Sequence, residues 1–416
     1  MKMTMLLSTG ILLFIATLFT ACEKEDGDQV VTPKSIKLTE QAPAVINSSN
    51  DFGIELFTKV AGDEPGNLML SPLSASSALT MLLNGCEGDT YQQLRSTLKY
   101  PEDVSLDDIN QAYSSLVEQL LKADEKVKLA LANAIFYRDG FTVKEPFLSS
   151  MQTDFSAFIA SLDFSSPSAL DVINGWASDN TNGKIEKVLD EISDDAVMFI
   201  MNALYFKGDW TNQFDESLTE DRMFYPDGRE GLMVSTMTGK VGAKTYSGDN
   251  YKAAELPYGR TNFTMVIMVP DETVADFTGS FTGSEWKALT DAFGEMDDYA
   301  ETEVFMPLYK FSYEKFLNDQ LKSMGMVDAF SPSMADLSGI SDAQIFVSFV
   351  KQNTFVEVNE KGTEAAAVTT IGVNLTSVPS GPPVFTVDKS FVFAIRERTT
   401  NTILFMGQVI EPEYDK

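Results

Sequence analysis

The sequence predicts an α+β fold in one large domain, on three observations. Its 416 residues are 44% hydrophobic and 22% charged, an ordinary globular composition with enough length for a large core. No stretch rich in proline, glycine and serine divides the chain after the N-terminal region, and no repeat period recurs. Amphipathic helical patterns and alternating strand patterns both occur along the chain.

The N-terminus has the features of an export signal. Lys2 precedes an almost unbroken apolar run over residues 5–19, which is too short for a membrane-spanning helix. Residues 1–21 are therefore expected to be a signal peptide. The small residues before Cys22 resemble the bacterial lipobox, whose cysteine becomes lipidated. The alternative is cleavage after Ala21 that leaves a free thiol.

Residues 22–45 lack any hydrophobic period and predict a flexible, lipidated tether ahead of one domain over residues 46–416. We expect an exported protein, held by lipid at a bacterial membrane or cell surface, or otherwise secreted.

Helices are predicted where apolar residues recur at helical spacing. Ser71 before Pro72 has the form of an N-cap with proline at the first helical position, and Gly85 is a plausible stop. Cys86 takes a small-residue position next to this helix and is expected to be buried. The other predicted helices are Asn47–Val60, Ser105–Leu121, Ala169–Asn180 and Tyr313–Met324.

Strands are predicted where apolar and polar residues alternate, or where a short run is wholly apolar. The run over residues 197–207 is too apolar for an edge strand. The predicted strands are Leu129–Tyr137, Val197–Lys207, Asn262–Pro270, Val304–Phe311, Ser348–Glu360, Phe391–Arg396 and Thr402–Val409.

The segment over residues 360–373 can be either an exposed loop or a buried strand. Side chains on a strand alternate between its two faces. One face would carry only uncharged residues, whereas the other would carry Glu364. Residues 374–383 are rich in turn-forming residues and predict an exposed loop. The uncharged face consists of Thr363, Ala365, Ala367, Thr369, Ile371 and Val373.

The stretch from Glu360 to Ala367 resembles, almost letter for letter, the hinge of the reactive loop in serpins, the suicide inhibitors of serine proteases. The resemblance extends over roughly residues 47–410. It implies a large central, mostly antiparallel sheet with further β-sheets, about eight or nine helices, and an exposed reactive loop over about residues 360–383. The matching strings are Ser71-Pro72-Leu73-Ser74, Asn202 to Trp210, Asp328 to Gly339, Glu360 to Ala367, and Phe405-Met406-Gly407.

The resemblance implies an inhibitor of serine endopeptidases, and also of cysteine endopeptidases, rather than an enzyme. A protease cuts the loop and stays attached as an acyl-enzyme while the loop enters the central sheet as a new strand. The alternatives are a non-inhibitory serpin fold used for binding or display, and a lipid-anchored enzyme. The hinge positions carried over are Glu360, Gly362, Thr363, Glu364, Ala365, Ala366 and Ala367.

Counting from the hinge by the family's usual spacing places the reactive bond at Thr376–Ser377, whereas counting back from Lys389 places it at Pro379–Ser380. Thr376 suits elastase-like or subtilisin-like proteases. Cleavage after Leu375, the alternative bond Leu375–Thr376, would suit chymotrypsin-like or papain-like enzymes. Trypsin-like targets are not expected, because no lysine or arginine lies between Lys361 and Lys389.

In the family, the region beneath the sheet that must part is called the shutter, and the place where insertion starts is called the breach. The resemblance puts Ser71, Ser74 and Asn202 in the shutter and Trp210 near the breach. A buried Asn202 needs hydrogen-bond partners, which the two serines or the backbone could supply. Gln352 stands where the family commonly has a histidine.

The charge and the missing residue types exclude several function classes. The formal net charge of −30 disfavours nucleic acid and heparin as partners. The chain has no histidine, which removes Ser-His and Cys-His catalytic pairs and histidine metal sites. We expect no cofactor, no metal, no disulfide scaffold, and a monomer whose partners are proteases and, through its lipid, a membrane.

Overall fold

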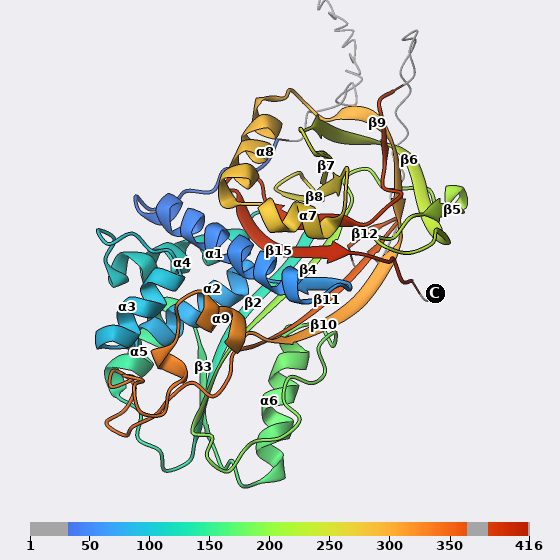
Figure 1. Ribbon diagram of the computed structural model, residues 1–416. Helices are drawn as coiled ribbons and strands as arrows, with labels where there is room; N and C mark the ends of the chain where they lie inside the picture. Colours follow the sequence, from blue (N-terminus) through green and yellow to red (C-terminus); the bar gives the residue numbers. More distant parts are fainter. Residues whose placement is uncertain (1–31, 364–381, 415–416) are drawn as a thin grey trace, which may run out of the picture. The chain divides into compact units, whose positions relative to one another are not determined.

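The computed structural model describes residues 32–363 and 382–414 (Figure 1). The chain divides into two units, residues 1–31 and residues 32–416, and the architecture below is that of the second unit.

A six-stranded central sheet has the strand order β10-β11-β12-β4-β2-β3. Its pairs are antiparallel except for β2 with β3, which are parallel. The prediction of a mostly antiparallel central sheet is therefore confirmed. The strands are β10 (Tyr309–Phe316), β11 (Lys351–Asn359), β12 (Gly362–Thr363), β4 (Met198–Asp209), β2 (Val127–Arg138) and β3 (Phe158–Leu162).

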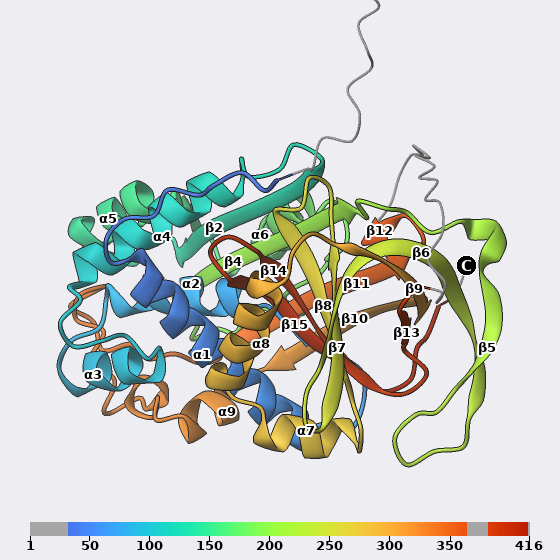
Figure 2. The same ribbon diagram turned by 90° about the horizontal axis from the view of Figure 1, so that it is seen from above.

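Nine further strands form a second assembly with the order β1-β15-β14-β8-β7-β6-β9-β13, in which β5 also pairs with β6. The long strand β6 joins its two parts, because it pairs with β7 at one end and with β9 and β5 along the rest. Figure 2 shows β5, β6 and β13 on the side away from α3 and α5. The strands are β1 (Leu68–Leu70), β5 (Glu220–Phe224), β6 (Leu232–Ser247), β7 (Tyr251–Pro257), β8 (Phe263–Pro270), β9 (Ala300–Pro307), β13 (Val384–Thr386), β14 (Phe391–Glu397) and β15 (Thr402–Val409).

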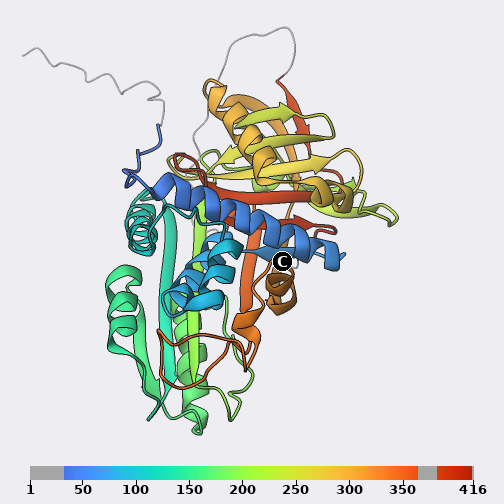
Figure 3. The same ribbon diagram turned by 60° about the vertical axis from the view of Figure 1, so that its left-hand side comes forward.

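Nine α-helices lie within the described residues, as the resemblance implied. Ser71 caps α2 as predicted, because its side chain accepts the backbone N–H of Ser74. α1 packs against α2 and β15 (Figure 3). The helices are α1 (Ala42–Asp63), α2 (Pro72–Leu83), α3 (Gly88–Thr97), α4 (Leu106–Leu120), α5 (Glu145–Phe155), α6 (Pro167–Asn180), α7 (Val274–Ser280), α8 (Gly283–Glu295) and α9 (Asn318–Ser323).

The two faces of the central sheet are covered by different helices. On β2, Ile135 belongs to the large core that includes α1, α2 and α4, whereas Phe136 belongs to a small cluster with Ile173 of α6. Neighbouring residues on a strand point to opposite faces. We call the face toward α2 the inner face and the face toward α6 the outer face.

Two sequence predictions about element bounds were wrong. The predicted strand over residues 304–311 is the end of β9 and the start of β10, two strands in different sheets. The helix predicted from Tyr313 is strand as far as Phe316, and α9 begins only at Asn318. Exposure alternates along β10, and this period of two was missed in the sequence.

The tether is also shorter than predicted. α1 begins at Ala42, with a proline in its first turn, so residues 42–45 are helical. Ahead of it, Lys34 exchanges two hydrogen bonds with the buried Asn262 side chain, at 2.7 and 2.8 Å. Among the described residues, no helix is both long enough and apolar enough to cross a membrane.

Candidate functional site

The central sheet is open between β4 and β11. At one end β12 lies between them, with Thr363 paired to Val358 of β11 and to Gly208 of β4. Beyond β12, the described residues of β4 and β11 share no ladder of their own. A cavity of about 20 Å³ lies next to Thr363, and one of about 300 Å³ continues along the strands. We call the space between β4 and β11 the slot.

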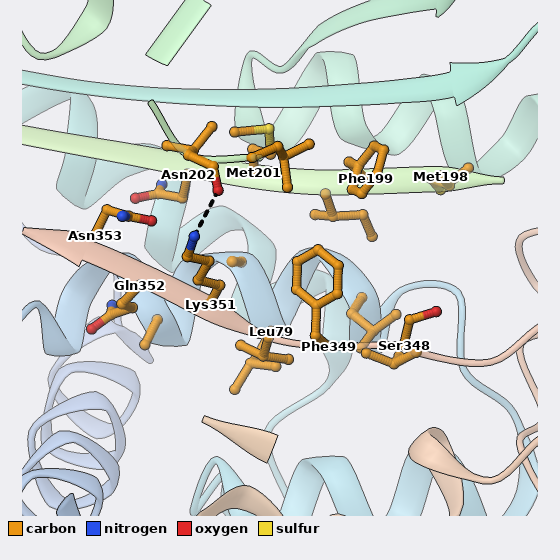
Figure 4. Close-up of a pocket in the computed structure, with 18 of the residues that line it drawn as sticks. Leu79, Met198, Phe199, Met201, Asn202, Ser348, Phe349, Lys351, Gln352 and Asn353 are labelled. Carbon is orange, nitrogen blue, oxygen red and sulfur yellow. Dashed lines mark hydrogen bonds between the residues drawn. The ribbon is translucent and has the colours of Figure 1, made fainter. Parts of the chain in front are cut away.

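The walls of the larger cavity come from both sheet faces (Figure 4). Helix α2 closes the inner side with Ser71, Ser74 and Leu79. The outer side is closed by α6 and the linker that follows it. The edges are lined by β4, by β11 and by the segment just before β11; among these residues are Met198, Phe199, Met201, Asn202, Phe349, Lys351, Gln352 and Asn353.

Trp210 holds the chain at the entrance of the slot. Its indole N–H donates to the backbone oxygen of Asn359 at 2.9 Å, and its backbone N–H donates to that of Lys361 at 2.8 Å. The indole stacks on Tyr258 with centroids 4.4 Å apart and an interplanar angle of 10°. Trp210, which the resemblance puts near the breach, thus lies beside the first residues of the hinge.

Tyr258 contacts both Trp210 and Thr363 from the inner face of the sheet. Its hydroxyl lies 2.6 Å from the hydroxyl of Thr363, which is 4% exposed. Burial raises the pKa of Tyr258, so the phenol stays a neutral hydrogen-bonding group. Thr363 thus points inward, on the side that its place in the alternating pattern predicts.

Gly362 is required by the close approach of two strands. A Cβ atom there would lie 2.1 Å from the backbone oxygen of Gly208, on a backbone with φ of +157°. Before it, the Glu360 carboxylate accepts a bond from Thr219 at 2.6 Å, and Lys361 pairs with Glu216 at 3.1 Å. The first hinge residues are therefore fixed in the structure.

Gln352 and Ser71 join β11 to α2 at the inner side of the slot. The Gln352 amide donates to the backbone oxygen of Ser71 at 2.8 Å and accepts its N–H at 3.2 Å. The Ser71 hydroxyl donates to the backbone oxygen of Leu404. Ser74 lines the same cavity. Three of the predicted shutter residues therefore meet.

The sequence analysis offered the two serines or the backbone as partners of the Asn202 side chain, and within the described residues it bonds to neither. It lies opposite Asn133 in the β2–β4 ladder, and its amide donates to the Asn133 side chain at 2.7 Å. Asn133 in turn donates to the backbone oxygen of Phe155 in α5. The side-chain oxygen of Asn202 is buried on the cavity wall without a hydrogen-bond partner.

The remaining predicted positions are Cys86 and the residues of the loop and the N-terminus. Cys86 is buried as expected, and burial raises the pKa of its thiol. Tyr258, Asn133 and Asn359 were missed, since none lies in a recognisable motif. Outside the described residues lie Cys22, Glu364, Ala365, Ala366, Ala367, Leu375, Thr376, Ser377 and the alternative bond Pro379–Ser380.

A family model described as serpin (serine protease inhibitor) matches residues 47–412. The chain belongs to the serpin family. It is 30% identical to an uncharacterized serpin-like protein of Methanosarcina acetivorans over 97% of this chain and 96% of that protein. It is 33% identical to Iripin-3 of Ixodes ricinus, over 94% of this chain and 97% of that protein.

Solved structures agree with the serpin fold. The native state of tengpin, a thermophilic serpin, matches with a TM-score of 0.80 and 30% identity, covering 91% of this chain and 97% of that one. The predicted serpin fold is confirmed. Family membership implies protease inhibition by the serpin mechanism, with target proteases as partners.

We expect loop insertion in this serpin to be independent of pH between about 5 and 8. The Gln352–Ser71 contact and the Asn202–Asn133 contact contain no ionisable group. In Gln352→His, burial would depress the histidine pKa below its usual value of about 6.5. Protonation would then be resisted by the native state, and stability would fall as the pH drops below about 6.5.

The measurement is the rate of loop insertion and the unfolding temperature at several pH values, for the wild type and Gln352→His. A clear midpoint near pH 6.5 in the wild type would show that another group controls the shutter.

Proposed function

We propose that this serpin traps serine endopeptidases, and papain-like cysteine endopeptidases, as covalent acyl-enzymes. The protease's nucleophile attacks the carbonyl carbon of Thr376, the amine of Ser377 leaves, and an ester or thioester joins the two proteins. The loop then enters the slot as a strand before water completes hydrolysis. Because a strand advances about 3.3 Å per residue, residues 364–376 would carry the protease about 40 Å.

The observation that carries this proposal is that Thr363 already lies between β4 and β11, with open space ahead of it. If this register continues, Ala365 will lie between Phe206 and Val356 and will face inward. Thr369 will then lie between Asn202 and Gln352. The inner neighbours of Ala365 are apolar and buried, so a small uncharged residue suits that position.

Thr369 would meet an unsatisfied group in the same register. The buried Asn202 oxygen lacks a partner, and a threonine hydroxyl can donate one hydrogen bond. A buried acceptor left unpaired costs about 1–3 kcal/mol. Pairing it with Thr369 would add to the stability of the inserted form, which supports insertion as the direction of the reaction.

The residues around the proposed bond favour proteases with small or apolar primary pockets. Thr376 fits elastase-like or subtilisin-like enzymes, and cleavage after Leu375 would fit chymotrypsin-like or papain-like ones. Cleavage at Pro379–Ser380 would lengthen the inserted segment by three residues.

The test is incubation with an elastase-like and a subtilisin-like protease, with a trypsin-like protease as the control. We expect a complex that survives denaturant for the first two only, together with a released fragment that begins at Ser377. Mass spectrometry of this fragment identifies the bond. A cut loop with fully active protease would instead mean a non-inhibitory serpin fold used for binding or display.

We also propose that residues 1–21 direct export and that Cys22 carries a lipid, which would make this a bacterial lipoprotein-type serpin. Lys34, which Asn262 holds, is twelve residue steps along the chain from Cys22. At about 3.3–3.6 Å per residue, the body would remain within about 40 Å of the membrane. Cys22→Ser should release the protein from the membrane fraction.

A further inference from the structure

The linker that follows α6 covers the slot on the outer face of the sheet. Thr181 and Ile185 line both cavities of the slot, and Val188 and Leu189 line the larger one. We call residues 181–189 the linker roof. Any strand that fills the slot will point its outward side chains at this roof.

The linker roof is fastened to the β2–β4 half of the sheet through α6. Asn174 of α6 accepts the backbone N–H groups of Val188 and Leu189 at 2.9 and 3.0 Å. Its amide also donates to the backbone oxygen of Leu189 at 2.9 Å. α6 itself packs on β2 and β4, with Ile173 fully buried. The linker roof is therefore attached through α6 to β2 and β4, and these elements form one packed unit.

Lys351 of β11 reaches the same roof from the other side of the slot. Its ammonium donates to the backbone oxygen of Val188 at 3.0 Å (Figure 4). It also pairs with Glu314 of β10 at 3.0 Å and lies 5.2 Å from the ring centre of Phe316. The side chain is only 7% exposed. Lys351 is thus held by the β10–β11 half and bonded to the other half.

A second contact across the slot is longer and more exposed. Lys184 of the roof lies over the Phe355 ring at 4.7 Å and is 4.0 Å from the Glu357 carboxylate. At 4.0 Å its ionic attraction is weak beside a direct charge-assisted hydrogen bond. The Lys351–Val188 bond is the shorter connection between the two halves.

We propose that the Lys351–Val188 bond is a latch that slows insertion of the reactive loop; this inference rests on the proposed function. The Lys351 side chain leaves β11 on the outer face and reaches Val188 of the linker roof, which covers the slot. In the register of β12, Thr370 would lie opposite Lys351 and point at the roof. An inserting strand would therefore have to displace the Lys351 side chain from the roof, and the hydrogen bond to Val188 fails once its two atoms are more than about 3.5 Å apart.

The test compares Lys351→Met with the wild type. Methionine keeps an apolar stem over Phe316 but removes the ammonium. The matched control is Glu314→Gln, which removes the ion pair and leaves the bond to Val188. Asn174→Ala, which loosens the roof from α6, is a second route to the same release.

Two rates are measured: loop cleavage by an elastase-like protease, and the subsequent gain of heat resistance that reports insertion. We expect Lys351→Met and Asn174→Ala to speed insertion about tenfold, the size of one charge-assisted hydrogen bond. Glu314→Gln should stay within about twofold of the wild type. The cleavage rate should be unchanged, which a general loss of stability would not predict.

In the variant that combines Lys351→Met with Asn174→Ala, the two increases in insertion rate should not add, because both substitutions act on the same connection between β11 and the linker roof. Insertion of Lys351→Met and Asn174→Ala at the wild-type rate would refute the latch and leave the proposed function standing. A cut wild-type protein that gains no heat resistance would refute the proposed function and the latch together.

Discussion

Cutting the reactive loop should raise the unfolding temperature by on the order of 10–20 °C. The segment after Thr363 would gain ladder hydrogen bonds to β4 on one side and β11 on the other. About a dozen such bonds, each worth roughly 0.5–1.5 kcal/mol net, add on the order of 10 kcal/mol. In a domain of this size, each kcal/mol shifts the unfolding temperature by about 1–2 °C, somewhat less than in smaller domains.

The measurement is thermal unfolding before and after a single cut between residues 364 and 381, followed by calorimetry or circular dichroism. The matched control is a cut of the same kind in the turn after β5, over residues 226–231, where a free end has no slot to enter. That cut should lower the unfolding temperature or leave it unchanged. Equal behaviour of both cut proteins would mean that the native chain is not metastable.

The sequence was most informative where local pattern and buried environment agree. β15 spans Thr402–Val409, as predicted, because its apolar run over residues 403–406 lies in a strand that is buried on both faces. The N-cap at Ser71 was also readable, since Ser-Pro is a local signal. Such features need only neighbouring residues to be recognised.

Features set by distant pairing could not be read in the same way. Asn202 bonds to Asn133 because the β2–β4 register places them opposite each other, across 69 positions of sequence. The Tyr258–Thr363 contact likewise joins residues 105 positions apart. No alternation or spacing within one strand contains the register of its partner. The family resemblance located the region of the site, and the coordinates located its contacts.

A charge on the inward side of the hinge should abolish inhibition. If the inserted loop continues the register of β12, Ala365 would lie between Phe206 and Val356, which are 6% and 1% exposed. In Ala365→Glu, insertion would bury a carboxylate without a cation, at a cost of about 3–5 kcal/mol. Insertion would slow by at least about 100-fold. Hydrolysis of the acyl-enzyme would then win, and the serpin would become a substrate.

The neighbouring residue gives the matched control. If the inserted loop continues the register of β12, Ala366 would lie between Tyr205 and Phe355 and would point outward, where Lys184 stacks over Phe355. A glutamate there would have a cation and solvent nearby, so Ala366→Glu should keep inhibition within a few-fold of the wild type. The measurement is the number of serpin molecules consumed for each protease molecule inhibited.

The two variants differ by one position, which is the smallest step that reverses the facing of a strand residue. If Ala366→Glu fails and Ala365→Glu inhibits, insertion occurs with the opposite face inward, and the Thr363–Tyr258 contact does not set the register. If both inhibit normally, the hinge does not enter the sheet, because no register places both side chains away from the core. An inserted strand that continues from β12 predicts one result only: Ala365→Glu loses inhibition and Ala366→Glu retains it.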